Sequence, residues 1–249
     1  MRAPQQPTSD TADSFPLSHY LPNLLTIAAI CAGLTAIRAA VTGDFAVAVQ
    51  LILVACLLDG LDGRLARRMG STSKIGAELD SLADFLNFGV ATPLVLYFWA
   101  LHEMESAAWL AVLIFTICCV LRLARFNVAA KSEAEVDSRF FEGLPSPAGA
   151  ILVMMPLYIA FAFPEAARVP GYVICLYMIG IGLLLISRLP TWSFKTTRVS
   201  RQNAIVFVVG FVLVGYGVLN HAWITMIVIC VGYAAIVAAF IPRKAQPAP

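Results

Sequence analysis

The chain has 249 residues, of which 60% are hydrophobic and only 13% charged, and its mean hydropathy is +0.82. A soluble domain of this length would need far more polar surface, so the composition excludes a soluble globular protein and indicates a polytopic membrane protein. The net charge of +2 is small, and no nucleic-acid partner is expected. The six cysteines lie inside apolar runs, where we expect buried, reduced thiols rather than zinc ligands or disulfides.

The polar start of the chain is the first element. Residues 1–15 are rich in Pro, Ser and Thr, and they lack the charged start and short apolar core of a secretory signal. We predict that residues 1–20 form a disordered cytoplasmic tail ending in a short segment at the membrane surface. Residues 242–249 are expected to form a second cytoplasmic tail.

Eight segments between these tails are apolar enough to cross a bilayer, which takes roughly 20 residues per helix. Lipid offers the backbone no hydrogen-bond partners, so we predict an all-α fold, a polytopic bundle of transmembrane helices. The predicted spans are 22–41, 45–67, 75–100, 107–129, 146–163, 170–188, 204–220 and 222–241.

The orientation of the bundle follows from its Lys and Arg residues, which favour cytoplasmic loops. With the N-terminus in the cytoplasm, fifteen of the seventeen basic residues fall on the cytoplasmic side, and only Arg38 and Arg168 fall outside. An even number of spans returns the C-terminus to the same side. We therefore expect both termini in the cytoplasm.

Four aspartates interrupt the apolar pattern in the stretch DGLDGRLARRMGSTSKIGAELDSLAD at 59–84. Asp59 and Asp62 lie three residues apart on one helix face, and Asp80 and Asp84 form an i, i+4 pair on the next helix. The short connection at 69–73 makes these helices antiparallel neighbours, so the two acidic faces can meet on the cytoplasmic half of the membrane.

Converging carboxylates in a low dielectric repel one another, and one or two divalent cations would remove the conflict. Oxygen-only ligands favour Mg²⁺ or Mn²⁺ over zinc. The alternatives are a proton-relay cluster or carboxylates paired with Arg64 and Arg67. Gly60, Gly63 and Gly76 weaken the helices but would open the backbone to a bulky ligand, and Arg67 is placed to bind a phosphate.

The stretch resembles the signature of the CDP-alcohol phosphatidyltransferase family, D-x-x-D-G-x-x-A-R-x8-G-x-x-x-D-x-x-x-D, at all eight fixed positions. The resemblance implies a six-helix membrane core, usually homodimeric, that transfers a phosphatidyl group from a CDP-linked lipid to an alcohol and releases CMP. It implies metal ligands for two ions at Asp59, Asp62, Asp80 and Asp84, with Asp84 also the catalytic general base. The implied CDP-lipid-binding residues are Asp62, Gly63, Ala66, Arg67 and Gly76.

Three further stretches resemble the bacterial members of the family that use L-serine: LPNLLTIAAICAGLTAIR at 21–38, LRLARFNV at 121–128 and FFEGLPSPAGA at 140–150. The resemblance covers the core at 21–190 and leaves the helices at 191–241 as an addition. It implies that CDP-diacylglycerol and L-serine give phosphatidylserine and CMP at the cytoplasmic face of the bacterial inner membrane, among membrane lipids. Asn23 and Thr26 are expected to approach the nucleotide.

The acceptor pocket is expected at the cytoplasmic end of the fourth span. Arg122 and Arg125 are one turn apart there, with Asn127 beside them, and they could hold the carboxylate of serine, with Ser146 closing the pocket. The alternative interpretation is that the arginines only snorkel to the membrane surface and that Ser146 belongs to an ordinary proline-rich helix start.

Two other functions compete with this interpretation. A different acceptor, such as glycerol 3-phosphate or an inositol phosphate, would require a denser basic cluster. A divalent-cation transporter would favour acidic residues at the membrane midplane with an outlet on both sides. The basic residues around the aspartates favour an anionic diphosphate ligand over transport.

Overall fold

The computed structural model describes residues 20–70, 73–131, 140–142, 144–166, 169–187, 190–192 and 201–240. The predicted tails at 1–19 and 242–249 lie outside this part of the chain, as do several basic residues behind the predicted orientation, among them Arg139, Arg198 and Lys244. Four helices in the described part are long and apolar enough to cross a membrane, and further apolar helices are shorter. The protein is therefore a helical membrane protein.

The first two helices form an antiparallel hairpin. Helix α1 (Leu21–Val41) and helix α2 (Phe45–Met69) are joined by a three-residue turn with Gly43 at φ 85°, and the side chain of Asp44 caps α2 by accepting from the Val47 amide at 3.2 Å. Alanines line their buried faces, so the backbones pack closely, as is typical of membrane helices. Gly70, at φ 62°, ends α2 in the left-handed conformation that favours glycine.

The predicted third span is one long helix of changing geometry, Lys74–Met104. It begins as α3 (Lys74–Asp84), where Ser73 caps the Gly76 amide at 2.9 Å. It continues as the π-helix η2 (Phe85–Ala91), α4 (Thr92–Leu96), the π-helix η3 (Tyr97–Leu101) and the short η4 (His102–Met104). The wide turns of η2 follow directly on Asp84, and π-helical turns occur often at functional sites.

The remaining elements are the helices α5 (Glu105–Lys131), α6 (Ser146–Val153), α7 (Met155–Ala162), α8 (Gly171–Ile186), α9 (Arg201–Asn220) and α10 (Ala222–Phe240). The predicted span at 146–163 is thus two helices, because Pro156 lacks an amide hydrogen and its ring disturbs the preceding turn at Met154. The all-α prediction also omits one small feature, the antiparallel pairing of strand β1 (Phe140–Glu142) with β2 (Pro190–Trp192).

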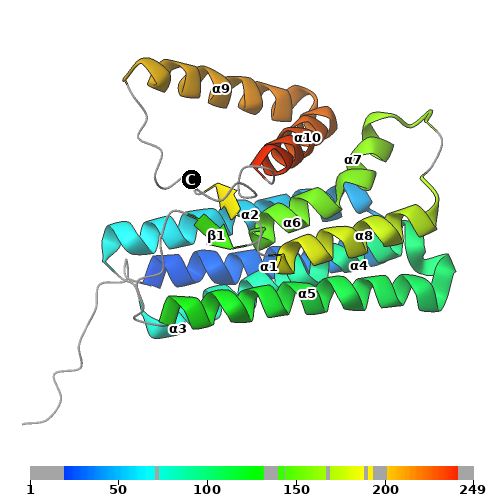
Figure 1. The fold of residues 1–249 in the computed structure, drawn as a ribbon, viewed down its shortest axis with the longest axis horizontal. Coiled ribbons are helices and arrows are strands. Elements are labelled where there is room, and N and C mark those ends of the chain that lie inside the picture. The colour runs from blue at the N-terminus through cyan, green and yellow to red at the C-terminus, as the bar shows by residue number, and fades with distance from the viewer. Residues whose placement is uncertain are drawn as a thin grey trace, which may run out of the picture.

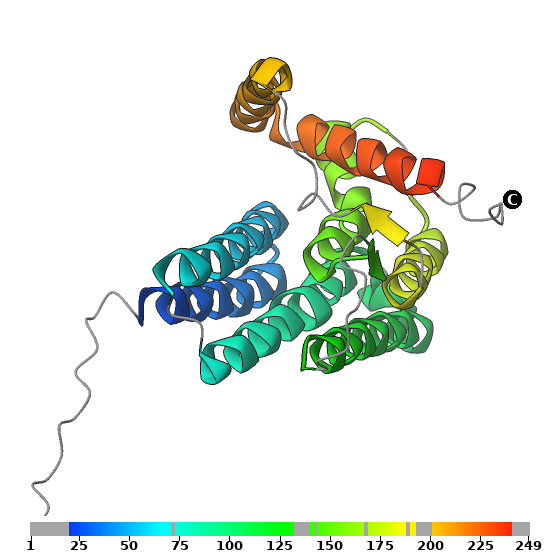
Figure 2. The ribbon, with the colours of Figure 1, turned by 60° about the vertical axis from the view of Figure 1, so that its left-hand side comes forward.

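The helices form one bundle with an outlying C-terminal pair. Figure 1 shows α1, α2, α5, α6 and α8 running along a common direction, with α7 and α9 inclined to them. Figure 2 shows α3 and α4 between the α1–α2 hairpin and the α5–α8 pair, with α9 and α10 to one side of the bundle. Tyr158, Phe115 and Ile52 are among the largest fully buried side chains of the main core.

The cysteines are free thiols, as predicted, but not all are buried. Cys118, Cys119, Cys175 and Cys230 are buried, whereas Cys56 is partly buried and Cys31 is exposed on the outer face of α1. The expectation of a buried thiol is therefore wrong for Cys31, because an apolar run in a membrane helix covers the lipid-facing side as well as the core.

Close contact between α5 and α8 depends on Gly182. A Cβ atom there would lie 3.3 Å from the Cα atom of Phe115, whereas one at Gly180 would meet nothing within 4 Å. We predict that Gly182→Leu lowers the free energy of unfolding by about 1–3 kcal/mol through overpacking, and that Gly180→Leu leaves it almost unchanged. Thermal unfolding in detergent would measure both, and equal midpoints for the two variants would contradict the prediction.

Candidate functional site

Three of the four signature aspartates converge where α2 and α3 meet. Carboxylate oxygens of Asp59, Asp62 and Asp80 all lie within 4.8 Å of one another, and Asp62 is only 3% exposed. The i, i+3 spacing on α2 and the short connection to α3 produce this arrangement, as the sequence predicts. The oxygen atoms of this cluster are ligands of the kind that hard divalent cations bind.

Asp84 joins the cluster from the last turn of α3. Its carboxyl group lies within hydrogen-bonding reach of that of Asp59. Within the described part of the chain, Asp84 Oδ1 and Asp62 Oδ1 are buried without a hydrogen-bond partner. A buried, unpartnered carboxylate oxygen is costly, and a divalent cation is the group that these oxygens fit. The acidic cluster is thus compatible with the metal dependence expected from the sequence.

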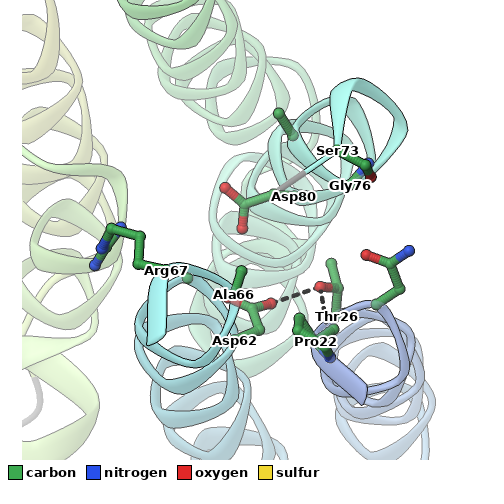
Figure 3. Close-up of a pocket in the computed structure, with 11 residues that line it drawn as sticks. Pro22, Thr26, Asp62, Ala66, Arg67, Ser73, Gly76 and Asp80 are labelled. Carbon is green, nitrogen blue, oxygen red and sulfur yellow. Dashed lines mark hydrogen bonds between the residues drawn. The ribbon is translucent and has the colours of Figure 1, made fainter. Parts of the chain in front are cut away.

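Thr26 on α1 is a further member of the site. Its hydroxyl donates to Asp62 Oδ2 at 2.6 Å, and the residue is 4% exposed. Figure 3 shows Thr26 and Asp62 pointing toward each other, with Asp80 extending from α3 above them. Thr26 therefore fixes one oxygen of Asp62 and leaves the other for a ligand. Its spacing gives no hint of this contact, because Thr26 lies 36 residues from Asp62.

A cavity of about 160 Å³ adjoins Asp62 and Asp80 between α1, α2 and α3 (Figure 3). Its wall includes every residue that the resemblance implies for the CDP-lipid: Asp62, Gly63, Ala66, Arg67 and Gly76. It also includes Asn23 and Thr26, as expected. A Cβ atom at Gly76 would lie 3.0 Å from Asn23 Oδ1 and 3.1 Å from Ser73 Oγ, so a larger residue there would crowd both side chains.

Two of the four expected acceptor residues meet on the other side of the aspartates. Arg122 Nη1, on α5, donates to the hydroxyl of Ser146 at 2.6 Å, and Ser146 is only 1% exposed at the start of α6. The guanidinium of Arg122 also interacts electrostatically with Asp84 and Asp59. Arg122 and Ser146 thus form a partly buried polar pair beside the acidic cluster.

The other two expected acceptor residues make different contacts. Arg125 Nη1 donates to the carbonyl oxygen of Ile186 at 3.1 Å, at the C-terminal end of α8, where cations stabilise a helix. Asn127 Oδ1 accepts from the Ser81 hydroxyl at 3.1 Å and so ties α5 to α3 between Asp80 and Asp84. The structure therefore separates Arg122 and Ser146 from Arg125 and Asn127.

Two residues near Arg122 carry no signal in the sequence. The buried thiol of Cys119 lies within hydrogen-bonding reach of Ser146, and Tyr233 of α10 interacts electrostatically with Arg122. Both belong to apolar runs, and Tyr233 lies 111 positions beyond Arg122. Only the three-dimensional packing brings them to this site.

Comparison with known proteins agrees with this geometry. Residues 19–179 match the family model described as CDP-alcohol phosphatidyltransferase. A protein of Mycobacterium leprae named CDP-diacylglycerol–serine O-phosphatidyltransferase is 40% identical over 215 residues, which are 86% of this chain and 71% of that protein.

Proteins with the same name from Mycobacterium tuberculosis and Helicobacter pylori are 39% and 33% identical, over 74% and 72% of this chain and 65% and 75% of their own lengths. The chain thus spans about two thirds of the length of the mycobacterial relatives. The family model and these similarities show that the chain belongs to the CDP-alcohol phosphatidyltransferase family.

Proposed function

We propose that the protein transfers the phosphatidyl group of CDP-diacylglycerol to the hydroxyl of L-serine, giving phosphatidylserine and CMP. The observation that carries the proposal is the partly buried Arg122–Ser146 pair beside the acidic cluster. The names of the similar mycobacterial and Helicobacter proteins support the same acceptor.

The aspartates would hold the metal and start the reaction. Asp59, Asp62 and Asp80, with Asp84, would bind two Mg²⁺ or Mn²⁺ ions, which when bound neutralise the diphosphate and orient an in-line attack. Thr26 keeps Asp62 in position. Asp84 takes the proton from the serine hydroxyl as the new oxygen–phosphorus bond forms. The bond between that phosphorus and the CMP oxygen breaks, and CMP leaves with the electron pair.

The cytidine end of the lipid substrate would occupy the cavity between α1, α2 and α3. Small residues there, Gly63, Ala66 and Gly76, leave room for the nucleotide, and Arg67 at the wall supplies a positive charge for a phosphate. The attacking serine hydroxyl and the leaving CMP would then lie on opposite sides of the phosphorus, as in-line displacement requires.

The acceptor site would lie at Arg122. A single, partly buried guanidinium suits the single charge of the serine carboxylate, whereas the phosphate of glycerol 3-phosphate or an inositol phosphate carries up to two charges. Ser146, which already accepts from Arg122 Nη1, would keep the guanidinium turned toward the aspartates.

We also propose eight spans, both termini in the cytoplasm, and a homodimer in the bacterial inner membrane, with the site facing the cytoplasm. The core would extend over 21–190 and the added helices over 191–241. The distribution of basic residues supports this orientation. We expect single cysteines introduced at Ser9 and Gln246 to react with an impermeant thiol reagent only after spheroplasts are lysed. Labelling of either residue in intact spheroplasts would contradict it.

The proposed reaction can be tested directly. In nanodiscs with CDP-diacylglycerol, we expect CMP release that requires both L-serine and Mg²⁺ or Mn²⁺ and stops when a chelator removes the metal. Glycerol 3-phosphate and inositol phosphate should not replace serine. CMP release with either of these acceptors but not with serine would assign another acceptor, and metal flux without CMP release would favour the transporter.

Substitutions of Asp84 and Asp59 should have different effects on turnover and on lipid binding. Asp84→Asn removes the base but retains the shape, so we expect turnover to fall about 10²–10⁴-fold while CDP-diacylglycerol still binds in the presence of metal. Asp59→Asn should abolish metal-dependent binding of the lipid together with turnover. Asp44→Asn, which keeps a helix cap far from the site, is the matched control. Near-normal turnover by Asp84→Asn would contradict its role as base.

Substitutions of Arg122 and Arg125 should also differ in their effect on the KM for serine. Arg122→Ala removes the proposed partner of the serine carboxylate, a charge-assisted contact of about 1.5–3 kcal/mol, so we expect the KM for serine to rise roughly ten- to a hundredfold. The KM for CDP-diacylglycerol should change much less. Arg125→Ala breaks the contact with Ile186 and should leave the KM for serine within about threefold of wild type. Equal effects of Arg122→Ala on both KM values would instead place Arg122 on the lipid phosphate.

A further inference from the structure

A second cavity, of about 550 Å³, lies between α6, α8 and α10. Leu152 of α6 and Ile181 and Leu184 of α8 form one wall, and Ala234 and Ala238 of α10 form the other. The small side chains on α10 leave the space open. It is far larger than the nucleotide cavity and shares no lining residue with it.

The packing of α10 explains why the cavity forms. The first part of α10 is held against α7, where the Trp223 ring stacks on Tyr158 at 6.4 Å between centroids and contacts Phe161 at 4.8 Å. The second part, from Cys230 to Ala238, lines the cavity instead. Figure 2 shows α10 crossing the bundle at an angle to α8. The aromatic contacts at one end thus hold the helix apart from α8 at the other.

The chemistry of the walls determines what can fill this space. The space is open on the side of α10, where Ala234 and Ala238 are exposed, so it is filled from its surroundings, because the lining atoms would otherwise lose their dispersion contacts. Water needs several polar partners, and these walls are almost entirely hydrocarbon. The volume lies in the usual range for a ligand pocket, roughly 300–1,000 Å³. The occupant is therefore a hydrocarbon chain.

Two of the residues that line the cavity relate it to the acceptor side of the candidate site. Tyr233 lines it and interacts electrostatically with Arg122. Leu144 also lines it and lies two residues before Ser146, the partner of Arg122. A chain lying in the cavity would have its phosphate end on the side of the aspartates, where metal ions bound to them would neutralise it.

We propose that this cavity binds one acyl chain of CDP-diacylglycerol and so fixes the phosphatidyl phosphate at the aspartates. The proposal rests on the proposed function. It also gives a role to α10, which lies outside the part of the chain that matches the family model. Since the surrounding lipid is as apolar as the cavity, the chain gains little free energy by entering. The cavity instead fixes the position of the substrate's phosphate, and turnover depends on whether the acyl chain is long enough to fill it.

Filling the cavity tests this role. Ala234→Trp and Ala238→Trp place an indole in it, whereas Ile236→Trp, on the lipid-exposed side of the same helix, is the matched control. With dioleoyl CDP-diacylglycerol, we expect kcat/KM to fall about tenfold or more for the two cavity variants. With the dihexanoyl substrate, whose chains are too short to fill the cavity, all three variants should match wild type, which also shows that they fold. Equal loss with both substrates, or the same loss in Ile236→Trp, would overturn the proposal.

Direct labelling tests occupancy without turnover. A CDP-diacylglycerol with a photoreactive group at the end of one acyl chain should cross-link to peptides containing 177–187 or 230–238, and unlabelled CDP-diacylglycerol should suppress the labelling. Ala234→Trp should abolish the labelling, and Ile236→Trp should retain it. Labelling that phosphatidylcholine suppresses equally well would mean bulk lipid only and would overturn the proposal. Since this readout needs no serine, it stands even if the transfer reaction proves to use another acceptor.

Discussion

The close approach of carboxylates inside an apolar bundle is the constraint on which the rest of the site depends. Asp59, Asp62 and Asp80 place oxygens within 4.8 Å of one another, and unshielded charges at such distances repel strongly in a low dielectric. Helix ends alone would not hold them. The alanine-lined contact of α1 with α2, the Ser73 cap of α3 and the Thr26 contact to Asp62 supply the rigidity. The bundle thus holds the acidic faces of α2 and α3 together, where a cation can bind.

Three regions of different chemistry adjoin the aspartates. The cavity of α1, α2 and α3 adjoins Asp62 and Asp80, and the Arg122–Ser146 pair lies near Asp84 and Asp59. The apolar cavity is lined by Tyr233, which interacts electrostatically with Arg122. Such an arrangement suits a substrate with a nucleotide, a diphosphate and hydrocarbon chains, because each part of the substrate contacts a surface of matching polarity. It also leaves the acceptor a separate approach to the phosphorus.

The aspartate cluster could be predicted from the sequence because its members are close along the chain and their spacing repeats with the helix period. The residues that line the nucleotide cavity follow from the same stretch. Arg122 and Arg125 could not be told apart, since both lie at the same helix end and their contacts, Ser146 and Ile186, come from other helices. The apolar cavity was equally hidden, because hydropathy does not reveal which face of α10 packs and which face leaves a space.

The π-helical segment η2 separates two tasks within a single helix. Hydrogen bonds to the fifth residue make each turn wider than in an α-helix, so the face that follows η2 is rotated relative to the face that carries Asp80 and Asp84. Thr92 donates to the Asn87 carbonyl at 2.9 Å, and the Asn87 side chain packs against Gly33 of α1. The polar face of this helix therefore ends at η2, where the hydrocarbon core begins. The helix itself continues past η2 as one span to Met104.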